Sequence, residues 1–200
     1  MSIMFIMGKK RIKIGQFRVV YRGPIYTISQ ARATYSDGHR ALFEQITRAP
    51  GGAVIPIDGK GKVLIAREYR PRLQRYAWIF PGGRGEVGER ARTTALRELR
   101  EETGLMAREA ALFHVFRFGN TLGWKDYYFL GKKLYPVPLV HNEDEDITLV
   151  PKTIPQLFSM LMAGDIEHPH VAYVILKLYR LRTRILRWAM SPHRTSASFL

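Results

Sequence analysis

The chain has 200 residues, which suits one domain, or one domain with a small appendage, and is enough to bury an apolar core. It has no cysteine, which excludes disulfides, thiol catalysis and zinc–cysteine sites, and it has no apolar run of the roughly 18–20 residues that a membrane span requires. The formal net charge of +15 favours anionic partners such as a phosphorylated substrate, nucleic acid or a membrane face.

The N-terminal part, residues 1–48, is predicted to form a small antiparallel β appendage. Its extended segments read FRVVY, PIYTISQARATY and RALFEQIT. Turn sequences rich in Gly, Pro and Asp separate them, as in a meander of antiparallel strands.

A main domain is expected at 49–184, followed by a basic C-terminal extension at 185–200. The predicted elements are, in chain order, strands at 53–58, 63–70 and 77–80, a helix at about 90–103, strands at 111–118, 126–134 and 147–150, and helices from about 154 and 168. Strands and helices that alternate in this way predict an α/β fold with a mixed sheet.

Three glutamates crowd one face of the helix predicted at about 90–103. Glu98 and Glu102 are four residues apart, and Glu101 is three residues from Glu98. Like charges so placed repel, so the cluster suggests a hard cation with oxygen ligands, Mg²⁺ or Mn²⁺. The alternative is an acidic solvated face with Arg97 and Arg100 as local partners.

These glutamates belong to a longer pattern, G-x5-E-x7-R-E-U-x-E-E-x-G-U, in which U is aliphatic. Its defined positions are Gly83, Glu89, Arg97, Glu98, Leu99, Glu101, Glu102, Gly104 and Leu105. The pattern resembles the Nudix box at every one of them. A chance match in this chain has a probability on the order of 10⁻⁷.

The resemblance implies the Nudix α/β/α sandwich and a division of roles within the box. The expected metal ligands are Glu98, Glu102 and the carbonyl of Gly82, and the expected catalytic carboxylates in the box are Glu101 and Glu102. Structural roles fall on Gly83, Glu89, Arg97 and Gly104. A competing dinucleotide-binding reading of Gly83-x-Gly85-x-x-Gly88 is disfavoured, because Glu86 and Glu89 would repel a pyrophosphate.

More loosely, the resemblance extends over about 17–181 and is similar to ADP-ribose pyrophosphatases and other nucleoside diphosphate sugar hydrolases. In that group an N-terminal β region exchanges between two subunits, which implies a homodimer. Arg70 matches the arginine that meets the substrate diphosphate. We expect Arg67 and Arg72 to be surface cations, and the six histidines, which show no metal spacing, to be structural.

The chain departs from this group at GNTLGWKD, residues 119–126. Trp124 falls where the group carries a glutamate, and we assign it to substrate binding. The water-activating base is therefore assigned to the acidic loop, as Glu145, with Glu143 and Asp144 beside it, while Asp126 is an alternative.

Function is thus predicted to be Mg²⁺-dependent hydrolysis of ADP-ribose or another nucleotide sugar to a nucleoside monophosphate and a sugar phosphate. We expect a cytoplasmic enzyme, because the basic residues follow the N-terminal apolar run, the reverse of a secretory signal. Of the 15 excess positive charges, 13 lie before Asp37 or after Glu167. They keep two alternatives open, an RNA 5′-end pyrophosphohydrolase and an idle nucleotide sensor that binds nucleic acid.

Overall fold

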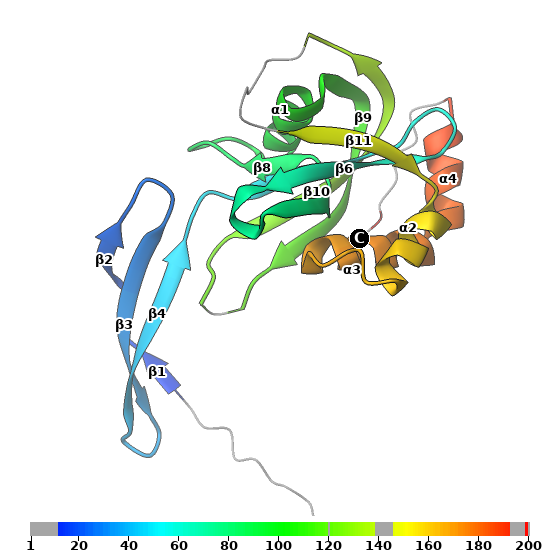
Figure 1. The fold of residues 1–200 in the computed structure, drawn as a ribbon. Helices are drawn as coiled ribbons and strands as arrows, with labels where there is room; N and C mark the ends of the chain where they lie inside the picture. Colours follow the sequence, from blue (N-terminus) through cyan, green and yellow to red (C-terminus); the bar gives the residue numbers. More distant parts are fainter. Residues whose placement is uncertain (1–11, 120, 139–145, 193–198, 200) are drawn as a thin grey trace, which may run out of the picture. The chain divides into compact units, whose positions relative to one another are not determined.

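The computed structural model describes residues 12–119, 121–138, 146–192 and 199. It contains two compact units (Figure 1). One comprises the chain up to Ala49 together with Phe118–Trp124, and the other comprises Pro50–Arg117 and Lys125–Leu200. Each unit is described by itself.

The N-terminal unit is an antiparallel sheet centred on β3 (Thr27–Tyr35). One edge of β3 pairs with β1 (Ile12–Ile14) and then with β2 (Arg18–Arg22), and the other edge pairs with β4 (Arg40–Thr47) along most of its length. The predicted antiparallel β region is confirmed.

The segment Phe118–Trp124 joins this unit by backbone hydrogen bonds to the end of β4. The amide of Ile46 donates to the carbonyl of Thr121, and the amide of Gly123 donates to the carbonyl of Ile46, each at 2.8 Å. A loop from the middle of the chain therefore belongs to the N-terminal unit.

The described part of the larger unit contains two sheets, four α-helices and the 3-10 helix η1 (Pro71–Leu73). The mixed sheet has the order β8 (Gly82–Arg84), β5 (Gly51–Pro56), β10 (Lys125–Pro136), β9 (Leu105–Arg117), with β5 and β10 parallel. The antiparallel sheet has the order β11 (Ile147–Lys152), β6 (Val63–Arg70), β7 (Arg75–Ile79). The helices are α1 (Ala91–Thr103), α2 (Ile154–Met162), α3 (Pro169–Arg180) and α4 (Arg182–Met190). The predicted α/β fold with a mixed sheet is confirmed.

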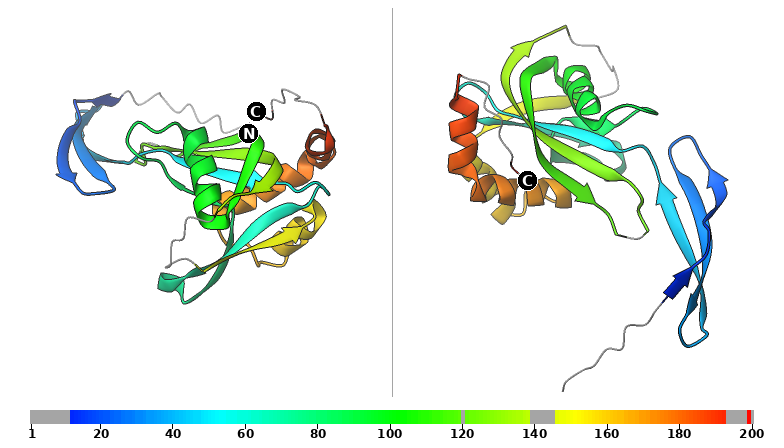
Figure 2. Two further views of the ribbon diagram at one scale, coloured as in Figure 1. Left: turned by 90° about the horizontal axis from the view of Figure 1, so that it is seen from above. Right: turned by 180° about the vertical axis from the view of Figure 1, so that it is seen from behind.

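Successive side chains of β5 face opposite sides of the mixed sheet, and they contribute to two separate hydrophobic cores. Ala53 and Ile55 join a core with α2, α3 and α4, whereas Val54 joins Ala95 and Leu99 of α1 on the other face. The helices therefore cover opposite faces of the sheets, as the ribbon shows from two further directions (Figure 2). This is the expected α/β/α sandwich. Among the described residues, no helix is long and apolar enough to cross a membrane.

The C-terminal residues 185–190 are part of the fold and not only a basic extension. Leu181 (φ −101°, ψ 11°) separates α3 from α4, and Ile185 and Trp188 of α4 are buried. The buried Lys132 donates to the carbonyl of Trp188 at 2.9 Å and pairs with Glu109 at 3.3 Å. This lysine ties α4 to the mixed sheet.

Close approach of α1 to β5 depends on Gly52. A Cβ atom at Gly52 would lie 2.3 Å from the carbonyl oxygen of Ala91 and 2.8 Å from the amide nitrogen of Ala95. We expect Gly52→Ala to lower the free energy of unfolding by about 1–3 kcal/mol, because backbone must move to admit the methyl group. Gly59→Ala, which has open space around it, is the control and should change stability by less than about 0.5 kcal/mol in urea titrations.

Candidate active site

The loop that precedes α1 approaches the helix at two consecutive glycines, Gly82 and Gly83. A Cβ atom at Gly83 would lie 2.5 Å from the carboxyl carbon of Glu98. The carboxylate of Glu98 therefore occupies the space that any other residue at position 83 would fill. On the neighbouring peptide, the amide of Gly82 donates to Oε2 of Glu102 at 3.0 Å. Two carboxylates from one face of α1 thus lie against the same short stretch of backbone.

Arg97 connects this loop to the helix. Its Nε and Nη2 donate to the two carboxylate oxygens of Glu89, both at 3.1 Å, and Nη2 also donates to the carbonyl of Arg84 at 3.3 Å. Nη1 lies 2.7 Å from Glu101 and 3.0 Å from Glu98. One guanidinium therefore holds three acidic side chains and a loop carbonyl.

The electrostatics of Glu89 follow from this pairing. The hydrogen bonds from Arg97 lower the pKa of the Glu89 carboxyl from 4.5 to about 2, even though burial acts in the opposite direction. The same pair raises the pKa of Arg97. The loop amide of Glu86 donates a further hydrogen bond to Glu89 at 3.0 Å. Glu89 is therefore ionised at neutral pH.

The box carboxylates offer only oxygen donors, which suit a hard divalent cation. Within the described ranges, no three acidic or histidine side chains are close enough together to enclose a metal ion. Glu98 and Glu101 turn toward Arg97, and Glu102 turns toward the Gly82 amide. Glu98 and Glu102 nevertheless both lie beside the Gly82–Gly83 backbone, and their carboxylate oxygens are the kind of ligand that a hard divalent cation takes.

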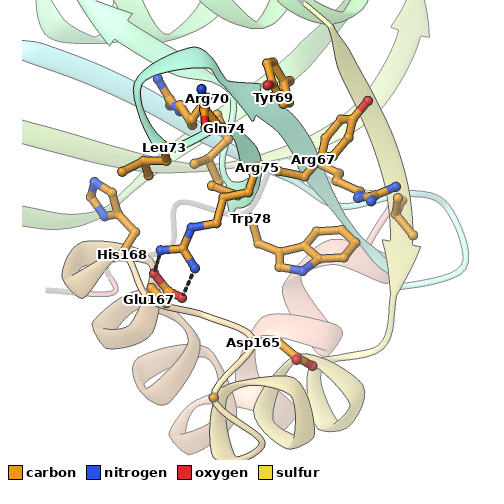
Figure 3. Close-up of a pocket in the computed structure, with 15 residues that line it drawn as sticks. Arg67, Tyr69, Arg70, Leu73, Gln74, Arg75, Trp78, Asp165, Glu167 and His168 are labelled. Carbon is orange, nitrogen blue, oxygen red and sulfur yellow. Dashed lines mark hydrogen bonds and ion pairs between the residues drawn. The ribbon is translucent and has the colours of Figure 1, made fainter.

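A cleft of about 1180 Å³ lies between the β6–β7 hairpin and the connection from α2 to α3 (Figure 3). Arg70 lines this cleft, as does Arg67, whereas Arg72 is outside the lining. Arg70 pairs with Glu68 at 2.8 Å. Arg75 reaches across the cleft to form two hydrogen bonds with Glu167.

Aromatic side chains form one wall of the cleft. Tyr69, Tyr76 and Trp78 project from the paired strands β6 and β7, and the Tyr69 and Tyr76 rings are 5.4 Å apart. The guanidinium of Arg67 lies 4.1 Å from the Tyr76 ring centroid. The box glutamates do not line the cleft, but Gly82 follows Trp78 by four residues, a distance of no more than about 14 Å.

His168 is a cleft residue that was expected to be structural. Burial lowers the pKa of its imidazole, and the charges of His170 and Arg70 act in the same direction, while Asp126 opposes them. His168 is the N-cap residue of α3 and follows the cleft residue Glu167. Nothing in its local sequence identifies it, because Arg70 and Asp126 are distant along the chain.

The remaining predicted residues fall in three places. Asp126 accepts a hydrogen bond from the Gly51 amide at 3.1 Å, at the start of the parallel pair β5 and β10. Trp124 belongs to the N-terminal unit, where the Arg48 guanidinium lies 4.6 Å from its ring centroid. The acidic-loop candidates Glu143, Asp144 and Glu145 lie outside the described residues.

Stability should show a pH dependence that reports the Glu89–Arg97 pair. We expect Glu89→Gln to lower the free energy of unfolding by about 1.5–3 kcal/mol at pH 7. Because the folded pKa of about 2 is below the unfolded value of 4.5, the stabilisation is fully present above pH 4.5 and is lost as pH falls through 2. Urea titrations from pH 7 to pH 3 should show the difference in unfolding free energy between wild type and Glu89→Gln narrowing without vanishing, and Glu86→Gln should show no difference at any pH. A constant difference would contradict this role.

Comparison with known proteins identifies the family to which this arrangement of loop and helix belongs. A family model described as the NUDIX domain matches residues 47–156. ADP-ribose pyrophosphatase of Bacillus subtilis (strain 168) is 29% identical over 142 residues, 68% of this chain and 76% of the relative. Methanol dehydrogenase activator of Bacillus methanolicus is 33% identical over 160 residues, 74% of this chain and 82% of the relative. The crystal structure of an ADP compounds hydrolase has the same fold, with a TM-score of 0.73 at 22% identity over 88% of this chain and 96% of that chain. The family model, which spans more than half of the chain, establishes that the chain belongs to the Nudix hydrolase family.

Proposed function

We propose that the protein hydrolyses the diphosphate linkage of ADP-ribose or another nucleotide sugar, giving a nucleoside monophosphate and a sugar phosphate. The observation that carries this function is the placement of Glu98 and Glu102 against the Gly82–Gly83 backbone, with Arg97 fixing the loop. An ADP-ribose pyrophosphatase is among the relatives and supports the substrate class.

We assign Mg²⁺, with Mn²⁺ as a substitute, to Glu98, Glu102 and the carbonyl of Gly82. When bound, the cation neutralises charge on the diphosphate. Glu101 is held by Arg97 at 2.7 Å, and we assign it with Glu102 to orienting the attacking water. Glu145 is the proposed base; the alternative is Asp126, whose carboxylate the Gly51 amide holds.

The cleft suits the uncharged part of the substrate, and Arg70 suits the diphosphate. All three arginines that line the cleft have a partner, because Arg75 pairs with Glu167, Arg67 lies over Tyr76 and Arg70 pairs with Glu68. We choose Arg70 because it matches the arginine that meets the diphosphate in the hydrolases that this chain resembles. Arg70 is held by Glu68 while its side chain remains 43% exposed. A guanidinium fixed in this way can present two parallel donors to phosphate oxygens.

We propose that the protein is a cytoplasmic homodimer. In this dimer, Trp124 and the N-terminal unit would help to enclose the nucleoside of the substrate. The unit exposes apolar side chains that a second subunit would cover, including Ile14, Val19, Val20 and Leu42. The absence of cysteine from the whole chain is consistent with a reducing compartment.

The metal assignment predicts a large loss of activity in Glu102→Gln. We expect Mg²⁺-dependent release of AMP from ADP-ribose, and a decrease in kcat of roughly 100-fold or more in this variant, because one metal ligand loses its charge. Glu86→Gln removes an exposed carboxylate from the loop before α1 and is the matched control. An unchanged rate in Glu102→Gln would exclude the assignment.

The role of Arg70 predicts a different kinetic change. Arg70→Ala should raise KM for ADP-ribose by about tenfold or more, because a charge-assisted contact with the diphosphate is lost. Arg72→Ala removes a neighbouring arginine that does not line the cleft and should leave KM unchanged. Equal KM values for the two variants would contradict the contact.

The substrate class has its own test, a metal-supplemented assay with sugar nucleotides and with capped or triphosphorylated RNA. Hydrolysis of the RNA but not of the sugar nucleotides would overturn the proposed substrate class.

A further inference from the structure

One side of the sheet in the N-terminal unit is exposed and positively charged. In β3, the exposed Arg32 lies between the buried Ala31 and Ala33, so the two sides of this strand differ in exposure. Residues paired with the exposed side of β3 share that side of the sheet. We define the basic sheet face by its four exposed cations: Lys13, Arg18, Arg32 and Arg40. We propose that this face binds single-stranded nucleic acid.

The strand register places Arg32 at the centre of the basic sheet face. Lys13 and Arg40 both pair with the residue two positions after Arg32 in β3. Arg18 pairs with the residue two positions before it. Each of these three cations is therefore a diagonal neighbour of Arg32, at a distance of about 7–8 Å. Like charges repel at this range, and an anionic chain laid across the face would remove the repulsion.

The cations of the basic sheet face have no carboxylate partner among the described residues. None of the ion pairs within 12–119, 121–138 and 146–192 involves any of the four. One acidic residue, Glu44, lies on the same side of the sheet, and its carboxylate accepts a hydrogen bond from Nε2 of Gln30 at 2.7 Å. Four guanidinium or ammonium groups are thus available to an anionic ligand.

Spacing and an exposed ring favour nucleic acid as that ligand. Alternate residues of β3 are about 6.8 Å apart, and the cations follow this repeat, which suits successive phosphates of an extended strand. Tyr21 pairs with Ile28, four residues before Arg32, so its side chain lies on the same side of the sheet. Its side chain is well exposed. Bases of a single strand stack on exposed rings, while guanidinium groups hold the phosphates.

The other side of the sheet offers apolar side chains for a second subunit. Ile14 and Val19 pair with residues of β3 that face this side. Leu42, in contrast, lies opposite Arg32 on the basic sheet face. A second subunit that covered Leu42 would also cover Arg32 and would compete with nucleic acid. The mass of the assembly is therefore part of the test.

Fluorescence anisotropy of the full-length protein with an oligouridine tests the proposal. The strand has a label at its 3′ end and a hydroxyl at its 5′ end, so it contains no diphosphate and reports binding independently of hydrolysis. Arg32→Gln with Arg40→Gln should weaken binding about tenfold or more, because two charge-assisted phosphate contacts are lost. The slope of log K against log[NaCl] should fall in magnitude by roughly 1.4, at about 0.7 for each phosphate contact.

Tyr21→Leu tests the stacking contact separately from charge. It should weaken binding of oligouridine about fivefold or more and leave the salt slope unchanged, because a ring is lost and no charge is removed. Inorganic polyphosphate, which has no bases, should bind wild type and Tyr21→Leu equally. An unchanged affinity of Tyr21→Leu for oligouridine would contradict the stacking contact.

Controls separate the basic sheet face from net charge. Arg180→Gln with Arg187→Gln removes the same charge from exposed positions of α3 and α4 and should leave the salt slope unchanged. An unchanged circular dichroism spectrum shows that Arg32→Gln with Arg40→Gln folds, and light scattering should give the wild-type mass. Equal losses in the two double variants, wild-type binding to phosphatidylglycerol vesicles but not to oligouridine, or a lower mass of Arg32→Gln with Arg40→Gln would overturn the proposal.

Discussion

The guanidinium of Arg97 is the group on which the rest of the box depends. Glu98, Glu101 and Glu102 occupy little more than one turn of α1, where like charges repel. Arg97 offsets that repulsion by contacting the first two directly, and it also fixes Glu89 at the end of the loop. Because Arg97 points from the helix to the loop, one residue both gathers the acidic side chains and sets the distance between loop and helix.

Two glycines complete that arrangement, because they leave room for close neighbours. Gly52 admits α1 against β5, and Gly83 leaves room for the carboxylate of Glu98. Neither glycine has a positive φ angle, so their requirement is for space and not for an unusual conformation. The helix that carries the acids is therefore placed by the same contacts that form the smaller of the two cores, around Val54 and Leu99.

Local sequence patterns were sufficient to predict the α/β fold, the helix that ends at Gly104 and membership of the Nudix family. They were insufficient where tertiary contacts determine which segments pair and where a helix breaks. The loop 118–124 joins the N-terminal unit through pairing with Ile46, which no local pattern encodes. The break at Leu181 has no proline or glycine to mark it, and α3 and α4 read as one amphipathic helix. His168 shares the cleft with Arg70 only after the chain folds, so no local sequence pattern marks it.

We propose above that Glu98, Glu102 and the carbonyl of Gly82 hold the divalent cation that hydrolysis requires. A crystal of the protein grown with Mn²⁺ would locate this cation, because anomalous scattering shows the position of the ion independently of activity. We expect an anomalous peak with oxygen atoms of Glu98 and Glu102 at about 2.0–2.3 Å, and loss of that peak in the double variant Glu98→Gln with Glu102→Gln. A bound Mn²⁺ ion elsewhere in the chain, with both glutamates still turned toward Arg97 and the Gly82 amide, would contradict it.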